Sequence, residues 1–160
     1  MKTCVMAVAL LLCAPAYAGE QKLPVTDVVF PDGFRVRAEL AVTGTEQELG
    51  LQFRTELAKD AGMLFVGGSE TRRIFWMLNT VIALDMVFIG DDHAVTRVHE
   101  NVPAADLSVS VQNPARRAGL ARYVLEVPAG TAKAHGLKKG DKLKFDLSAL
   151  NSTKPDTAAK

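Results

Sequence analysis

The sequence predicts a mainly β fold, a sandwich or barrel of short strands with two short helices in a single compact domain. Two observations favour this class. Apolar residues occur in short runs separated by turn residues such as Gly, Pro and Asp. Helical patterns are confined to two short segments, and the chain contains no internal repeat. A chain of 160 residues is long enough for one domain with a substantial core.

The first eighteen residues have the pattern of a secretory signal peptide. Lys2 supplies a positive charge, residues 5–13 are apolar, and residues 16–18 (Ala-Tyr-Ala) form a small-residue cleavage site. The apolar run is shorter than the roughly 20 residues of a membrane span. We therefore expect cleavage after Ala18, a mature chain without a membrane span, and a periplasmic or secreted location. Both cysteines, Cys4 and Cys13, lie in the segment removed, so the mature chain would contain no disulfide.

The N-terminal half predicts a hairpin and then a helix. Residues 19–24 are expected to be a short tether to a β-rich domain at 25–147. A Pro-Asp-Gly turn at 31–33 separates a strand at 25–30 from a clearly alternating strand at 34–42. Thr45 and Glu48 have the spacing of a capping box, which predicts a short helix from Thr45.

The remaining elements follow from turn residues and short apolar runs. A Gly-Gly pair at 67–68 is expected to end the next strand, and aperiodic residues 103–119 to form a long loop. A short helix is expected at 128–135, and a loose polar tail at 148–160. The further strands are expected at 62–66, 72–78, 83–89, 94–99, 121–127 and 142–147.

Residues 74–88 form the densest apolar stretch outside the first twenty residues, yet they contain the carboxylate of Asp85. On a strand, Leu84, Met86 and Phe88 would face one way and Asp85 the other, with apolar residues on both sides. An unpaired carboxylate there would cost several kcal/mol. We therefore expect Asp85 to be paired, hydrogen-bonded, protonated or at the rim of a cavity; it could equally anchor a loop and have no chemical role. The candidate partners are Arg54, Arg72, Arg73, Arg122 and Asn79.

Polar residues next to Trp76 predict a cleft, since a Trp ring beside polar groups is a common pocket wall. The expected apolar wall consists of Phe65, Trp76 and Met77, and the polar determinants are Arg54, Asn79 and Asp85. Arg122 and Glu126 share one face of their strand, where they could form a network with Asp85 or an ordinary surface pair.

Several motifs in a fixed order resemble the family of uncharacterised secreted proteins called DUF192. The resemblance covers about residues 25–147 and implies a compact β-rich domain, found in bacteria and archaea and often behind a signal peptide. It implies no activity. The family commonly has Lys and Met where this chain has Leu78 and Gln52, so a ligand contact made by that Lys would be lost here. The motifs are Gly50 to Arg54, Gly62 to Phe65, Phe75 to Thr80, Leu84-Asp85, Tyr123 to Gly130, Gly136-Leu137 and Gly140-Asp141.

Motifs for metal and cofactor chemistry are missing from the sequence. The three histidines have no metal-ligand spacing, and there is no serine elbow, phosphate loop or dinucleotide glycine pattern. Without Lys2 the chain has 18 basic and 18 acidic residues, so no charge excess favours nucleic acid or an anionic membrane. We expect no metal and no cofactor.

These observations favour an exported, monomeric β domain that binds a small molecule or peptide in a cleft. One alternative is a cofactor-free hydrolase or lyase that uses Asp85 or Glu126 for acid–base chemistry. Another is an accessory protein of the cell envelope that binds a protein partner.

Overall fold

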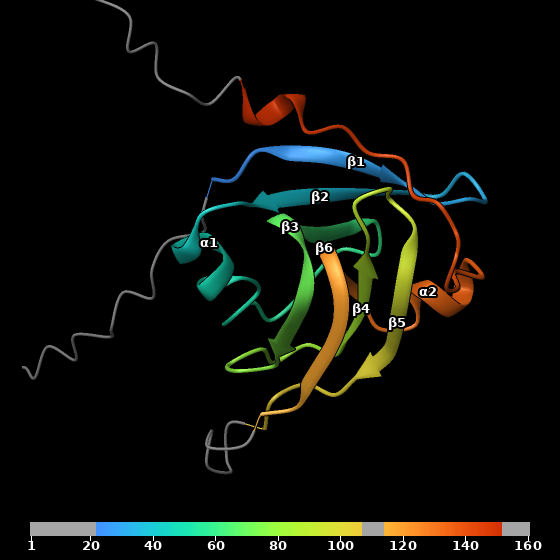
Figure 1. The fold of residues 1–160 in the computed structure, drawn as a ribbon. Coiled ribbons are helices and arrows are strands. Elements are labelled where there is room, and N and C mark those ends of the chain that lie inside the picture. Colours follow the sequence, from blue (N-terminus) through green and yellow to red (C-terminus); the bar gives the residue numbers. More distant parts are fainter. Residues whose placement is uncertain (1–21, 107–113, 152–160) are drawn as a thin grey trace, which may run out of the picture.

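A six-stranded sheet in the order β1-β2-β3-β6-β4-β5 forms the framework of the protein. The computed structural model describes residues 22–106 and 114–151 (Figure 1). The expected signal peptide, residues 19–21 of the tether, part of the expected loop and most of the tail lie outside the described residues. The strands are β1 (Val25–Val29), β2 (Arg35–Ala41), β3 (Ala61–Trp76), β4 (Leu84–Ile89), β5 (Val95–Val102) and β6 (Arg116–Pro128).

The sheet is mixed and open. β2 and β3 pair in parallel, with Arg37 opposite Ala61, and every other neighbouring pair is antiparallel. The helix α1 (Gly44–Leu49) lies in the connection that makes the parallel pairing possible. The sheet is strongly twisted, so that β1 and β2 run across β4, β5 and β6 (Figure 1). The short helix α2 (Thr131–Ala134) lies on the opposite side of the molecule from α1. The predicted mainly β class with two short helices is confirmed.

Apolar side chains cover both faces of the sheet and form two cores. Core A includes Leu64, Val87 and Leu125, and core B includes Met63 and Met86. Along β4 the side chains alternate between these cores, as the sequence predicts for a covered central strand, and all six residues of β4 are buried. No helix among residues 22–106 and 114–151 combines the length and the apolar character that crossing a membrane requires.

The start of α1 differs from the sequence prediction. Thr43, not Thr45, is the N-cap: its hydroxyl accepts a hydrogen bond from the backbone N–H of Glu46, and the Glu46 carboxylate accepts one from the N–H of Thr43. Both threonines are followed three residues later by Glu, because two overlapping copies of the pattern occur in the sequence. The copy that coincides with the end of β2 forms the cap.

Several element boundaries differ from the prediction. Residues 116–119, expected in a loop, belong to β6. β3 is one strand of 16 residues, and the Gly-Gly pair at 67–68 produces a shift in its register with β6 instead of ending it. The expected strand at 142–147 is wrong: Lys142 and Lys144 form only isolated bridges, to Ala94 and Val29. The tail is not loose from its first residue, since η1 (Ser148–Leu150) packs apolar side chains against core A.

Candidate functional site

Asp85 anchors a loop within the fold. Its side chain is fully buried. Oδ1 accepts hydrogen bonds from the backbone N–H groups of Asn101 (2.8 Å) and Gly130 (3.1 Å), and Oδ2 accepts one from that of Ala132 (2.8 Å). These bonds join β4 to the end of β5 and to the turn that leads into α2. None of the expected partners, the four arginines or Asn79, supplies these contacts.

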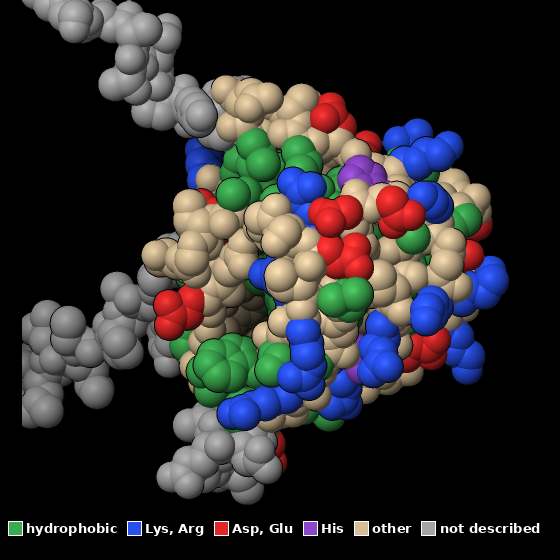
Figure 2. All heavy atoms as spheres, in the orientation of Figure 1, with side chains coloured by type: hydrophobic (Ala, Val, Ile, Leu, Met, Phe, Trp, Pro, Cys, Tyr) green, Lys and Arg blue, Asp and Glu red, His purple; other side chains and the backbone are tan. Residues whose placement is uncertain are grey.

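A different carboxyl group, that of Glu126, lies at a surface pocket of about 510 Å³ between α1 and β3, which Trp76 also lines. Figure 2 shows the hollow, with apolar side chains along its lower border. The pocket volume is in the usual range for small-molecule sites. Its lining consists of residues 47–52, Phe65, residues 72–76, Leu78, Thr80 and Glu126.

Glu126 contributes the buried acidic group of this pocket. It lies on the central strand β6, directly opposite Met63 of β3 on one side and Met86 of β4 on the other. Both methionines belong to core B, so Glu126 projects from the same face of the sheet. The residue is only 5% exposed, and burial raises the pKa of Glu126 to about 8. At neutral pH the carboxyl group is therefore mostly protonated in the empty pocket.

The Glu126 carboxyl group has no hydrogen-bond or ion-pair partner among the described residues, and loss of hydration alone accounts for its raised pKa. Every fully enclosed side-chain nitrogen or oxygen atom in the same part of the chain does have a partner. The Glu126 oxygens are therefore not sealed in the core but reach the open volume of the pocket.

Arg73 and Gln47 hold α1 against the sheet and fix the wall of the pocket. The Arg73 guanidinium donates to Gln47 Oε1 at 2.7 Å and to the backbone oxygen of Arg122 at 3.0 Å. Gln47 Nε2 donates to the backbone oxygens of Ala41, Val42 and Val66. Partial burial lowers the pKa of Arg73. The polar groups of both side chains are thus used by the protein itself.

Aromatic rings form the apolar part of the wall. Phe65 is buried and meets Phe75 edge to face, with ring centres 4.8 Å apart. Trp76 is 49% exposed. Each of the two outer rings has a guanidinium group near its face: Arg73 lies 5.3 Å from the centre of Phe75, and Arg116 lies 5.8 Å from that of Trp76.

The structure places three of the eight predicted binding residues, Phe65, Trp76 and Glu126, in this pocket. Asn79 does not line the pocket, but its side-chain amide donates to Gln52 Oε1 at 3.0 Å, and Gln52 is on the wall. The other four lie elsewhere. Arg54 forms an ion pair with Glu39 beside a separate depression, Arg122 contacts Asp91, Met77 is in core B, and Asp85 binds backbone groups.

The predicted binding set lacked the other residues of the pocket lining, among them Gln47, Arg73, Leu78 and Thr80. Their proximity depends on α1 folding over β3, for which the sequence has no local signal. The available signal was in Glu126, the only charged residue in the apolar run Tyr-Val-Leu-Glu-Val. Within the described ranges, no group of three or more His, Cys, Asp or Glu side chains could hold a metal ion.

Fold and site define a small, mainly β protein whose pocket contains one buried acid. Residues 28–145 match the family DUF192, described as "Uncharacterized ACR", and the chain belongs to this family. Leu78, at the position where the family commonly has Lys, lies on the wall of the pocket.

Two solved structures are similar over most of their length. A protein of unknown function from Novosphingobium aromaticivorans has 37% sequence identity and a TM-score of 0.66, over 88% of this chain and 99% of that one. A protein from Sinorhizobium meliloti, named as a candidate transcription regulator, has 35% identity and a TM-score of 0.64, over 76% of this chain and 92% of that one. No curated protein matched the chain.

Proposed function

We propose that this protein binds a small molecule or peptide in the pocket lined by Phe65, Trp76 and Glu126. The supporting observation is the Glu126 carboxyl group, which is buried, has no partner in the described residues and opens into the pocket. Burying such a group without a partner costs free energy. An unpartnered buried carboxyl group does not stabilise the fold. It is useful in a binding site, because a ligand can supply the missing contact.

Trp76 offers a direct assay because it is the only tryptophan of the chain and half of its surface is exposed. A fragment and peptide library is screened by Trp fluorescence and by amide chemical shifts. Binding of a hit should change the amide chemical shifts of residues in α1, in β3 and at Glu126 together. Trp76→Ala should weaken the binding of the hits about tenfold, since aromatic contacts carry much of the energy of small binding sites. The matched control is Leu120→Ala, which removes another exposed apolar side chain that does not line this pocket. Hits that map elsewhere, or that are insensitive to Trp76→Ala, would count against the proposal.

A second candidate is acid–base catalysis by Glu126, favoured by its pKa of about 8. A carboxyl group that titrates near neutrality can both donate and accept a proton during a reaction. The two functions are separable with Glu126→Gln. A catalytic role predicts that the folded variant still binds its substrate but no longer turns it over, whereas a binding role predicts weaker binding and no turnover in the native protein.

We further propose that the domain works outside the cytoplasm, in the periplasm or secreted, after cleavage following Ala18. The supporting observation is the segment 1–18, with its positive start, apolar run and Ala-Tyr-Ala end. Mass spectrometry of the protein recovered from a periplasmic fraction should give a chain that begins at Gly19. A full-length chain confined to the cytoplasm would refute this.

A further inference from the structure

We infer that the pocket selects ligands with a primary ammonium group on an apolar chain, such as a lysine side chain, and that Glu126 forms the ion pair with this ammonium. The inference rests on the proposed binding function and adds the class of ligand.

The surroundings of Glu126 provide apolar packing but no counter-charge. Its direct neighbours on the adjacent strands are Met63 and Met86, which have no hydrogen to donate. Burial therefore keeps the group neutral when the pocket is empty. A cation in the pocket would reverse this, because an opposite charge close to a carboxylate favours its ionised form.

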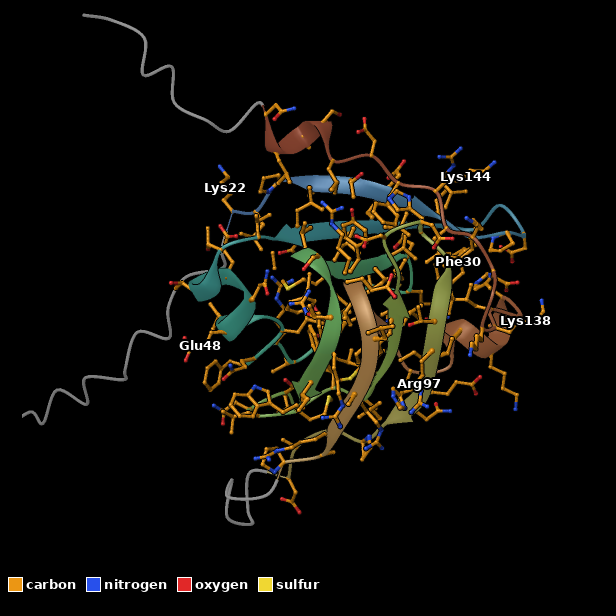
Figure 3. The ribbon with its side chains drawn as sticks, in the orientation of Figure 1. Lys22, Phe30, Glu48, Arg97, Lys138 and Lys144 are labelled. Atoms are coloured by element: carbon orange, nitrogen blue, oxygen red, sulfur yellow. The ribbon has the colours of Figure 1, made fainter. Side chains whose placement is uncertain are left out.

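The two arginines of the pocket do not fill this role. Arg73 is held by Gln47 and by the backbone of Arg122, and Arg72 is exposed on β3. No ion pair connects either of them to Glu126 in the described residues. The remaining charged group, Glu48, is exposed at the outer side of α1 and points away from the body of the protein (Figure 3).

The shape and chemistry of the wall fit a slender amine. Phe65, Phe75, Trp76 and Leu78 offer apolar and aromatic surface for a methylene chain. Phe75 and Trp76 already attract guanidinium groups to their faces, so this part of the molecule accepts positive charge next to its rings. An ammonium places three donors on a compact point charge at the end of a flexible stem.

The experiment compares two probes that differ in the terminal ammonium group, which the second one lacks. Nα-acetyl-lysine methylamide and Nα-acetyl-norleucine methylamide are titrated into the native protein at pH 7, with Trp76 fluorescence as the readout. We expect the lysine compound to bind about tenfold more tightly or better, which corresponds to about 1.4 kcal/mol. In Glu126→Gln, which has the same shape but cannot ionise, the two compounds should bind equally.

Two further variants make the assignment specific. Leu78→Lys places an amine on the wall of the same pocket, and we expect it to compete with the ligand and to weaken the lysine compound about tenfold. Glu100→Gln removes an exposed acid that does not line the pocket and should change the affinity less than about twofold, because exposed charge pairs contribute little. Circular dichroism and melting curves check that each variant is folded.

Proton release provides an independent readout. Because the Glu126 carboxyl group is mostly protonated in the empty pocket, binding of an ammonium below pH 8 should release a proton. The affinity should therefore rise between pH 6 and pH 8, with Glu48, Arg72 and Arg73 as the other charged groups of the pocket. Equal binding of the norleucine compound inside the pocket would overturn the inference and leave the proposed function standing. If neither compound binds, the inference is refuted. The proposed binding function is then tested separately by the library screen.

Discussion

Replacing Glu126 with Gln should stabilise the protein, and the gain should grow with pH. In the unfolded chain this carboxyl group has an ordinary pKa of 4.5, whereas burial raises the pKa of Glu126 to about 8 in the folded protein. Between these values the folded state binds more protons than the unfolded state, so the free energy of unfolding falls as pH rises. The slope is about 1.4 kcal/mol per pH unit. The loss in the free energy of unfolding caused by Glu126 is absent below pH 4.5. It reaches about 3 kcal/mol at pH 7 and levels off near 5 kcal/mol above pH 8.

Urea unfolding at pH 5, 7 and 9, followed by Trp76 fluorescence, measures this dependence. The difference between Glu126→Gln and the native protein should be small at pH 5 and largest at pH 9. Glu48→Gln is the matched control: the same substitution at an exposed pocket residue should change stability by less than about 0.5 kcal/mol. The reasoning is refuted if Glu126→Gln destabilises the protein, or if its effect is the same at all three pH values.

Three further substitutions test the framework around the pocket. Asp85→Asn should destabilise the fold by about 3 kcal/mol and lower the melting temperature by roughly 10 °C. The reason is that one of the backbone N–H groups that Asp85 binds would face the amide NH2 group instead of an oxygen. An unchanged melting temperature would show that these bonds contribute little. Thr43→Ala should cost about 1 kcal/mol by removing the cap of α1, whereas Thr45→Ala should cost much less, and the reverse order in urea unfolding would contradict the assignment of the cap. Gly62→Ala should cost about 2 kcal/mol, since the added carbon would lie 2.7 Å from the backbone oxygen of Glu126 and force β3 away from β6; a crystal structure of the variant with an unmoved strand would show this to be wrong.

The two buried carboxylates have opposite environments, and this contrast organises the molecule. Asp85 faces core A and is fully used by three backbone N–H groups. Glu126 lies one strand away on the other face, where the donors are missing. A buried carboxyl group with all its hydrogen bonds fixes a loop, whereas one without partners is available to a ligand. This is why the proposed site is centred on Glu126.

Local patterns predicted much of the fold. The hairpin, the covered strand β4 and the short helix α2 all follow from turn residues and from the period of the apolar residues, which are properties of neighbouring positions. The length of β3 could not be predicted from local patterns, because Gly67 and Gly68 are compatible with either the end of a strand or an irregularity within it. Pairing with β6 decides between the two. The prediction of a last strand was wrong, since the residues of this segment form only isolated bridges with other strands.

The site was less predictable than the fold. The sequence could identify both isolated carboxylates but could not tell which of them would find donors, because those donors come from Asn101, Gly130 and Ala132, distant in the chain. The structure places Trp76 and Phe65 together on the wall of one pocket. The position of α1, which supplies the opposite wall, results from the capping at Thr43 and from the contact between Gln47 and Arg73.

The ionisation of Glu126 tests the central claim most directly. In protein labelled with ¹³C at the glutamate side chains, the carboxyl carbon of Glu126, assigned by its loss in Glu126→Gln, is followed by NMR from pH 3 to pH 10. We expect a midpoint near 8 that moves to lower pH when the lysine compound is added. A titration midpoint between pH 4 and pH 5 for Glu126 in the ligand-free protein would show that the carboxylate is hydrated or paired, and would contradict the account.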